Sequence, residues 1–334
     1  MGKILTLGES LLRLTTPEGY KFADASNMEI HAGGAEANVA INLAKLDHQV
    51  KYATKLPQNN GFTEKIRNEL QGNGIDCSAV LYGRGRLGTY YLELGTGLRA
   101  SNILYDRNYS AISLMEAIEW DLDELFEDVS VFHLTGVTLA LSKKWFQMGK
   151  ELIQEAKKRN IKISFDMNYR QTMWSYKDAK ETYQKILPLV NYLSAGKLDA
   201  IHFMDIPEKK EENWEYYIEN IAHQYPNIEY IFGTNRHAIT PNSYDMDGYI
   251  WDVKENKGIV SVPYKNYTVV DRVGTGDSYM AGILDGIILN RPLEETVNFA
   301  MAASALKHTV YGDINPFNRN EIESFMNNTA NVLR

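Results

Sequence analysis

The feature that most constrains the fold is the alternation of strand-like and helix-like segments along most of the chain. Short apolar runs predict strands at 3–8, 50–54, 129–135, 161–168, 191–195 and 228–234. Apolar residues at helical spacing predict helices at 35–46, 62–72, 143–158 and 178–190. Such alternation predicts an α/β fold with a mainly parallel, helix-covered sheet. Ligands of these sheets bind beyond the carboxyl ends of the strands.

Two segments interrupt this alternation. Residues 10–31 and 86–108 have strand-like patterns with turns and aromatic residues but no helical periodicity. We interpret them as a small antiparallel sheet that projects from the main body. Because both segments flank glycine motifs, this sheet could cover the site as a lid. The alternative is an ordinary β-excursion without that role.

The composition excludes several classes of function. Asp and Glu total 43 against 35 Lys and Arg, which argues against binding to nucleic acid or to an anionic membrane. No run of 18 apolar residues occurs, and the N-terminal stretch MGKILTLGES lacks the apolar region of a signal peptide. The single cysteine, Cys77, cannot form an intrachain disulfide or a thiolate zinc site. These features favour a cytoplasmic location.

A glycine pair precedes a predicted helix in the stretch HAGGAEANVAINLA, residues 31–44. Glycine allows backbone N–H groups to approach a ligand closely at the start of a helix. Asn38 follows Gly34 by four residues, so its carboxamide could hydrogen-bond to sugar hydroxyls at the same place. The alternative is a glycine turn followed by a closely packed helix of small residues.

A second glycine turn lies in the stretch VVDRVGTGDSYMAG, residues 269–282. Gly274, Thr275 and Gly276 can direct successive N–H groups toward one anion, and the helix dipole adds to the attraction. Asp277 would then lie in the first helical turn, where a carboxylate can accept a proton from an attacking hydroxyl. We expect the helix terminus to keep the pKa of Asp277 low. If Asp277 only capped the helix, the adjoining Gly-Thr-Gly would be unexplained.

Other common catalytic motifs are absent. The chain contains no GxxxxGK[ST] phosphate loop and no GxGxxG after the first strand. It also contains no HExxH metal motif and no GxSxG nucleophile motif.

Together, GGAEANVA and DRVGTGDSYMAG resemble the two signatures of the ribokinase-like (phosphofructokinase-B type) carbohydrate kinases, GG-x-x-x-N and D-T-x-G-A-G-D. The resemblance covers essentially the whole chain. It implies a three-layer fold in one domain, 1–334, with a lid formed by about 10–31 and 86–108. It also implies that Asp277 is the catalytic base and that Gly274 to Gly276 form the anion hole. Arg272 and Thr275 depart from the motif, which has threonine and alanine there.

Within this family, LTLGESLLRLTTPEG, GTYYLELG, ILYDRNYSA and DMNYRQTMW are most similar to the 2-dehydro-3-deoxygluconokinases. That likeness implies that the substrate is an acid sugar. The residues that it assigns to the sugar are Gly34, Asn38, Tyr90, Tyr105, Arg107, Arg170, Asp277 and Asp313. Arginine binds a carboxylate through a planar fork, which suits a 2-keto acid better than a neutral sugar. The alternative for Arg107 and for Arg170 is a surface salt bridge, which contributes little.

The resemblance further implies ATP and Mg²⁺, with a monovalent cation such as K⁺ as a further candidate. For the nucleotide it indicates Asn168, Thr234, Arg236, Gly274 and Gly276. The stretch 231–240 nevertheless lacks the usual second glycine. In the stretch SAGKLDA, Gly196 stands where the family's N-x-x-E motif has asparagine. Asp199 could still hold magnesium-bound water.

The resulting hypothesis is ATP-dependent phosphorylation of the terminal hydroxyl of 2-dehydro-3-deoxy-D-gluconate, which gives the 6-phosphate and ADP. One alternative is a kinase for a neutral sugar or nucleoside, such as fructose or ribose. Another is a sugar-binding sensor without catalytic activity. We also expect a homo-oligomer, because small β lids with exposed apolar faces often pair.

Overall fold

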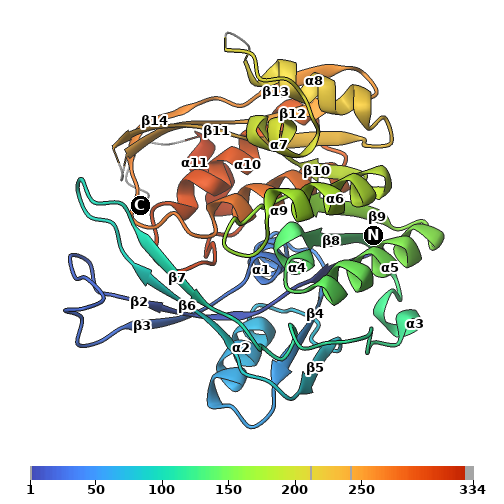
Figure 1. The fold of residues 1–334 in the computed structure, drawn as a ribbon. Coiled ribbons are helices and arrows are strands. Elements are labelled where there is room, and N and C mark those ends of the chain that lie inside the picture. The colour runs from blue at the N-terminus through green and yellow to red at the C-terminus, as the bar shows by residue number, and fades with distance from the viewer. Residues whose placement is uncertain (1, 211–212, 241–242, 328–334) are drawn as a thin grey trace.

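The computed structural model describes residues 2–210, 213–240 and 243–327. A large sheet lies between two sets of helices, and a smaller sheet projects from one side (Figure 1). In the described part of the chain the large sheet has ten strands. They are β1 (Lys3–Leu7), β4 (Val50–Pro57), β5 (Val80–Gly83), β8 (Val129–Thr135), β9 (Lys162–Asp166), β10 (Tyr192–Ser194), β11 (Tyr230–Thr240), β12 (Ser243–Asp252), β13 (Lys257–Val260) and β14 (Tyr264–Thr268).

The large sheet is parallel over most of its width. Its order is β13-β12-β11-β10-β9-β8-β1-β4-β5, with β14 beside β12. All pairs from β5 to β11 are parallel, whereas the pairs of β12 with β11, β13 and β14 are antiparallel. The six predicted strands are therefore confirmed. The antiparallel edge was not predicted, because its strands mix polar and charged residues with apolar ones and lack a continuous apolar run.

Helices cover both faces of the large sheet. Their bounds are α1 (Ala35–Lys45), α2 (Gly61–Gly72), α3 (Leu122–Leu125), α4 (Gly136–Leu139), α5 (Lys143–Lys158), α6 (Tyr176–Ile186), the 3₁₀ turn η1 (Leu187–Leu189), α7 (Lys197–Phe203), α8 (Trp214–Gln224), α9 (Thr275–Ile288), α10 (Leu293–Lys307) and α11 (Arg319–Asn327). The four predicted helices correspond to α1, α2, α5 and α6. One apolar core lies under α5, α6 and α8, and a second lies under α1, α9 and α10. Two cores on opposite faces confirm the three-layer arrangement.

The smaller sheet comes from the two segments that interrupt the alternation. Its strands are β2 (Leu11–Thr15), β3 (Glu29–Gly33), β6 (Gly88–Glu93) and β7 (Asn102–Asp106), in the order β3-β2-β6-β7. The two outer pairs are antiparallel, but β2 and β6 are parallel. The expectation of an antiparallel sheet is therefore wrong for this central pair. β2 and β6 belong to two separate hairpins that leave the main body in the same direction, so their first strands run side by side.

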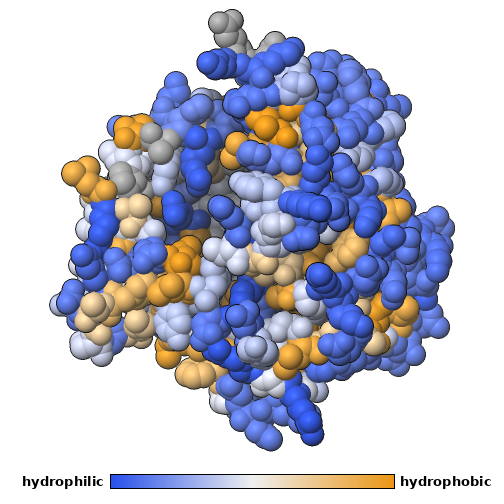
Figure 2. Space-filling model, viewed as in Figure 1, coloured by the Kyte–Doolittle hydropathy of each residue, from blue (hydrophilic) through white to orange (hydrophobic). Residues whose placement is uncertain are grey.

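Apolar side chains are exposed on the smaller sheet. Ile30 and Leu104 are 39% and 55% exposed, and Leu98, in the turn before β7, is 89% exposed. Apolar surface is visible over this part of the molecule at the left of Figure 2. Among the described residues, the helices are all too short or too polar to cross a membrane.

Candidate active site

A cavity of about 650 Å³ lies between the large sheet, the smaller sheet and the N-termini of α1 and α9. It lies beyond the carboxyl ends of β1, β8 and β9, as the fold class predicts. Twelve of the predicted site residues line it: Gly34, Asn38, Tyr90, Tyr105, Arg107, Asn168, Arg170, Arg236, Gly274, Gly276, Asp277 and Asp313. Three others, Thr234, Thr275 and Asp199, are not among the lining residues.

The second glycine turn forms the start of α9. Gly274 is the N-cap residue and has a φ of 80°, a left-handed conformation that favours glycine. A side chain there would also collide with the backbone, since a Cβ atom would lie 1.8 Å from the carbonyl oxygen of Asp313. The first N–H groups of a helix have no acceptor within it. Those of Thr275, Gly276 and Asp277 are therefore available to an anion in the cavity.

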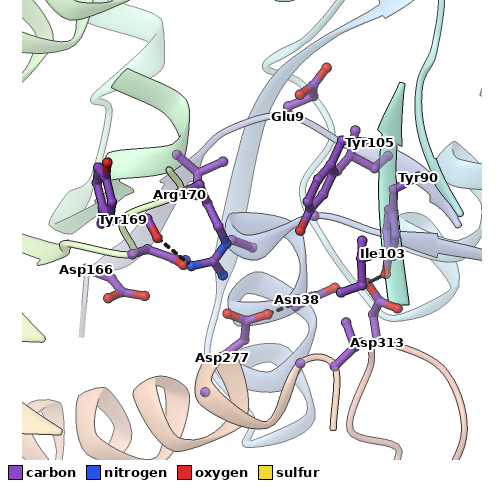
Figure 3. A pocket seen from close by; sticks show the side chains of 18 of the residues that line it. Glu9, Asn38, Tyr90, Ile103, Tyr105, Asp166, Tyr169, Arg170, Asp277 and Asp313 are labelled. Atoms are coloured by element: carbon purple, nitrogen blue, oxygen red, sulfur yellow. Dashed lines mark hydrogen bonds between the residues drawn. The ribbon is translucent and has the colours of Figure 1, made fainter. Parts of the chain in front are cut away.

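Asp277 lies in this first turn and is held by Asn38. The Asn38 Nδ2 atom donates to Asp277 Oδ2 at 2.7 Å, which joins the two predicted motifs across 239 positions of sequence (Figure 3). The carboxylate lines the cavity, so a substrate hydroxyl can reach it. The two glycine motifs therefore form one site.

The environment of Asp277 differs from the expectation in one respect. Its pKa is raised to about 7, chiefly because burial disfavours the charged form. The negative charges of Asp166 and Asp313 raise the pKa as well, whereas the Asn38 hydrogen bond and the charge of Arg170 lower it. The expected low pKa is therefore wrong, because burial and two neighbouring carboxylates outweigh the helix terminus.

Asp166 lines the cavity at the end of β9 and was not predicted as a site residue. Burial raises its pKa, while a hydrogen bond with Ser194 and the charge of Arg170 lower it. A signal was present in the sequence, since FDMN places a carboxylate at the carboxyl end of a predicted strand. Asp166 adds a second carboxylate to the region around Asp277.

Arg107 is paired with a carboxylate of the protein itself. Its Nε atom donates to Glu9 Oε2 at 2.7 Å, and its Nη2 atom contacts the same oxygen. Glu9 is 2% exposed and lies just after β1. The remaining guanidinium nitrogen, Nη1, lies 3.5 Å from the sulfur of Met173. Glu9 was not predicted as a site residue, and it offsets the charge that the carboxylate clamp was expected to use.

Arg170 has no such counter-ion. Its Nη1 atom donates to the carbonyl oxygen of Tyr169 at 3.0 Å, and Figure 3 shows the guanidinium directed toward Asp277. Within residues 2–210, 213–240 and 243–327, no carboxylate forms an ion pair with it. Arg170 therefore presents a positive charge to the cavity.

The smaller sheet supplies one wall of the cavity. Tyr90 from β6 and Tyr105 from β7 lie with their ring centroids 5.9 Å apart. The Tyr90 hydroxyl donates to Asp313 Oδ2 at 2.5 Å, so this tyrosine and this carboxylate contact each other at the cavity edge. Leu11 and Ile103 from the same sheet also line the cavity.

The structure places some of the residues expected to contact the nucleotide on the cavity wall and others away from it. Asn168 and Arg236 line the cavity, and so does Arg272, one of the two departures from the family motif. Thr234 lies on β11 outside the set of lining residues. The Thr275 hydroxyl donates to the carbonyl oxygen of Arg272 at 2.9 Å. Thr275 therefore stabilises the turn through its side chain.

Asp199 caps a helix. Its Oδ2 atom accepts a hydrogen bond from the Gly196 N–H at 2.9 Å, at the start of α7. Burial raises its pKa to about 7, and the nearby charge of Asp166 adds to the shift. In the part of the chain that the structure describes, no three His, Cys, Asp or Glu side chains form a cluster that could hold a metal ion.

Comparison with known proteins agrees with this geometry. The family model described as pfkB family carbohydrate kinase matches residues 1–320. A 2-dehydro-3-deoxygalactonokinase from Haloferax volcanii is 28% identical over 96% of this chain and 95% of its own length. A PfkB family carbohydrate kinase from Listeria grayi superimposes with a TM-score of 0.93 at 42% identity, over 98% of this chain and all of its own. A 2-dehydro-3-deoxygluconokinase from Thermotoga maritima gives the same TM-score at 29% identity, again over 98% of this chain and all of its own.

The family match and the named relatives, together with the cavity at the glycine turn, identify the protein as a sugar kinase. The chain belongs to the pfkB family of carbohydrate kinases.

Proposed function

We propose that this kinase transfers the γ-phosphoryl group of ATP to the terminal hydroxyl of a 2-keto-3-deoxy sugar acid. The substrate we favour is 2-dehydro-3-deoxy-D-gluconate, and the products are the 6-phosphate and ADP. The observation that carries the proposal is the contact of Asn38 with Asp277 at the start of α9, in a cavity that Arg170 also lines. The named relatives that act on such acids support the substrate class.

Asp277 acts as the general base. It takes the proton of the terminal hydroxyl as the oxygen forms its bond to the γ-phosphorus and the bond to the ADP oxygen breaks. Asn38 orients the carboxylate through the 2.7 Å hydrogen bond. A pKa of about 7 means that the carboxyl group is near half ionised at neutral pH, which suits a group that must gain and lose a proton.

The backbone of the Gly274–Gly276 turn stabilises the charge on the transferring group. Its N–H groups and the helix dipole attract the phosphoryl oxygens without having to reorganise. Arg236 and Arg272 line the same cavity and are candidates for the phosphates of ATP. Positioning and electrostatics supply most of the acceleration in phosphoryl transfer, so these groups complement the base.

The charge of the cavity supports an acid sugar. Arg170 lines the cavity without a carboxylate partner in the part of the chain that the structure describes, and a planar guanidinium binds a carboxylate through two parallel hydrogen bonds. Arg107 lines the same cavity, but Glu9 and Met173 contact its guanidinium, so we expect it to contribute less than Arg170. Tyr90 and Tyr105 complete the sugar side of the cavity.

One observation favours the alternative of a neutral sugar. Because Glu9 offsets the charge of Arg107, Arg170 is the arginine of the expected two-arginine clamp that has no carboxylate partner among the described residues. One arginine without a counter-ion supports an acid substrate less strongly than a clamp of two arginines would. The presence of Asp277 beside the glycine turn speaks against a sugar sensor without catalytic activity.

ATP is the phosphoryl donor of kinases in this family. Magnesium bound to its phosphates would supply charge neutralisation. Asp166 lines the cavity and lies close enough to Asp199 to raise the pKa of that residue, so these carboxylates are the candidates to accept hydrogen bonds from magnesium-bound water. A monovalent cation such as K⁺ stays a prediction. The cytoplasmic location stays a prediction.

We assign the smaller sheet the role of a lid and of an oligomer interface. It places Leu11, Tyr90, Ile103 and Tyr105 on the cavity wall, so its position determines how much water reaches Asp277. Its outer apolar side chains, including Ile30 and Leu104, would be covered if two lids paired. Light scattering coupled to gel filtration measures the assembly, and a wild-type protein that is monomeric at micromolar concentration would contradict the interface.

A substrate panel tests the proposed function. ATP consumption is measured with 2-dehydro-3-deoxygluconate, 2-dehydro-3-deoxygalactonate, fructose and ribose under matched conditions. We expect kcat/KM to be highest for one of the two acids. A preference for fructose or ribose would reject the carboxylate argument and favour the neutral-sugar kinase. No ATP consumption with any sugar would favour the sensor.

A further inference from the structure

We propose that Arg13 is a positioning residue for phosphoryl transfer, which joins the Gly274–Gly276 turn to the lid sheet through Asp271 and Asp313. The inference rests on the proposed roles of this turn and of Asp277. Arg13 lies in the middle of β2 and has no exposed surface. A charge without access to water is costly unless it is fully paired, so its contacts define its role.

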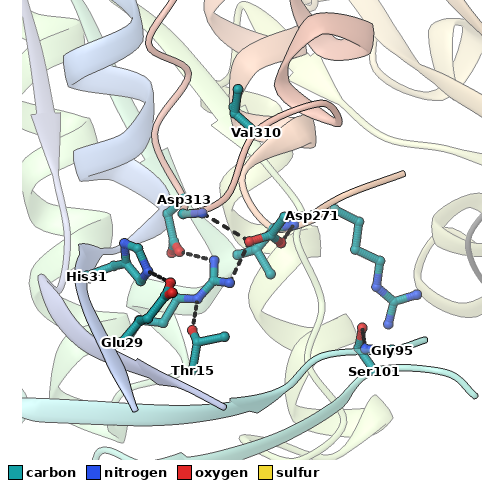
Figure 4. A network of polar contacts seen from close by, with 12 residues as sticks. Thr15, Glu29, His31, Gly95, Ser101, Asp271, Val310 and Asp313 are labelled. Atoms are coloured by element: carbon teal, nitrogen blue, oxygen red, sulfur yellow. Dashed lines mark hydrogen bonds and ion pairs between the residues drawn. The ribbon is translucent and has the colours of Figure 1, made fainter. Parts of the chain in front are cut away.

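The Arg13 guanidinium is paired in three directions. Nη1 donates to Asp313 Oδ1 at 2.8 Å, and Nη2 donates to Asp271 Oδ2 at 2.5 Å. Nε donates to the hydroxyl of Thr15 at 2.7 Å. Figure 4 shows these three acceptors arranged around the guanidinium. Both carboxylates are nearly inaccessible to water, since the Asp271 side chain is 1% exposed and the Asp313 side chain is 3% exposed.

The two carboxylates hold the segments on which the glycine turn rests. Asp271 Oδ1 accepts a hydrogen bond from the N–H of Val273 at 3.0 Å, and its Oδ2 accepts one from Gly312 at 3.1 Å. The carbonyl oxygen of Asp313 lies against Gly274, where it leaves no room for a Cβ atom. The position of the turn is therefore set by residues that Arg13 holds in place.

The same network reaches the sugar side of the cavity. Asp313 Oδ2 accepts the hydroxyl hydrogen of Tyr90 from β6, the strand that pairs with β2 beside Arg13. The lid strands β2 and β6 and the anion-binding turn are thus joined through one guanidinium. A rigid connection of this kind fixes the distance between the sugar wall and the phosphoryl-binding amides, on which the reaction depends.

Arg13 also controls the charge near the base. The groups that act on Asp277 are Asn38 from α1, Asp166 at the end of β9, Arg170 after that strand, Asp313 from the C-terminal segment and Lys307 from α10. Asp313 raises the pKa of Asp277, and Arg13 offsets the charge of Asp313 at 2.8 Å. Burial lowers the pKa of Lys307, so its ammonium group loses its charge more readily than a guanidinium does.

Two substitutions separate positioning from stability. Arg13→Lys keeps the charge but cannot join two carboxylates with a planar fork. We expect kcat per folded molecule to fall about 10- to 100-fold, with the KM values for ATP and sugar nearly unchanged. Arg13→Met also removes the charge, so we expect its kcat to require a higher pH than wild type, because Asp313 is no longer offset. Arg13→Lys should leave that pH dependence unchanged.

Arg319 provides the matched control. Its guanidinium donates to both oxygens of the buried Asp285, at 2.9 and 2.7 Å, far along α9 from the turn. Arg319→Lys and Arg319→Met should lower the melting temperature and leave kcat per folded molecule and its pH dependence unchanged. Turnover is measured with the best sugar of the panel, well below each melting temperature.

Specific outcomes would overturn the inference. Wild-type kcat per folded molecule in Arg13→Lys would do so, and so would an equal loss in Arg319→Lys. If Arg13→Met does not fold, Arg13→Lys still tests the inference, because a positioning role predicts a lower kcat with nearly unchanged KM values. Asp277→Asn tests the proposed function separately. Undiminished turnover in that variant rejects the base, whereas an inactive Asp277→Asn beside a wild-type-like Arg13→Lys rejects only the role of Arg13.

Discussion

Two groups of arginines and carboxylates lie near the Gly274–Gly276 turn, and they differ in how completely their charges are paired. In the first group, Arg13 has three protein acceptors and no exposed surface. On the cavity side, Arg170 has a carbonyl contact but no carboxylate partner among the described residues, and Asp277 has one neutral donor. The paired group supports the site, whereas the incompletely paired group is left to bind a ligand and move a proton.

The largest expected effect concerns the stability of the paired group. Arg13→Met leaves Asp271 and Asp313 buried without a counter-ion and should lower the free energy of unfolding by about 3–5 kcal/mol. Arg319→Met should lower it less, because His48 still contacts Asp285 at 2.7 Å. Urea unfolding at pH 7.5 or so measures both. A smaller loss at Arg13 than at Arg319 would contradict the contrast.

On the cavity side, the largest effect is on turnover. Asp277→Asn should lower kcat by at least ~100-fold, the usual scale for the loss of a general base, while the KM values change little.

The same substitution should stabilise the folded protein at high pH. The pKa of Asp277 is raised from 3.8 to about 7, so its contribution to stability is present below pH 4 or so and is lost as the pH rises through about 7. Asp277→Asn should therefore melt above wild type at pH 8 and near wild type at pH 4, and the reverse order would reject the raised pKa.

The unpaired arginine should matter for the acid group of the substrate. Arg170→Ala should raise the KM for 2-dehydro-3-deoxygluconate about 10- to 100-fold, because hydrogen bonds to a charged group contribute about 1.5–3 kcal/mol. Arg107→Ala should have a smaller effect, since Glu9 already uses part of its guanidinium. Steady-state kinetics with the acid and with fructose measure both. Equal losses for the two sugars would show that Arg170 does not read the carboxylate.

The pH dependence of the wild-type enzyme follows from the state of Asp277. The base must be ionised, so kcat should fall by about tenfold for each pH unit below a pKa near 7. A pH–rate profile measures this limb. A flat profile down to pH 5 would show that the bound substrates lower the pKa of Asp277 in the working complex or that another group is the base.

The smallest effect is expected at an exposed pair. On the lid, Arg86 contacts Asp106 through two hydrogen bonds of 2.6 and 2.5 Å, but both side chains are more than 40% exposed. Arg86→Met should change the free energy of unfolding by no more than about 1 kcal/mol and leave kcat unchanged. A loss as large as that of Arg13→Met would show that burial does not decide the strength of these pairs.

Much of this site was predictable from the sequence because its signals are local. Gly274, Gly276 and Asp277 adjoin in the chain, and a glycine turn before a helix predicts an anion site whatever lies around it. Arg170 follows a predicted strand closely. Glu9 and Arg13 were not predicted as site residues, because their roles depend on partners that are distant in the chain. Asp166 was not predicted although its place at the end of a predicted strand was a local signal.

The sequence by itself determined the α/β fold, the two glycine motifs and the polar residues at the ends of the strands, because helix and strand periodicity and turn chemistry are local properties. Only the tertiary structure decided which charged side chains are paired with an opposite charge. It placed Glu9 on Arg107, 98 positions away, and Asp313 on Arg13, 300 positions away. It also raised the pKa of Asp277 through burial and distant carboxylates. Pairing and burial depend on three-dimensional proximity, which residue order does not contain.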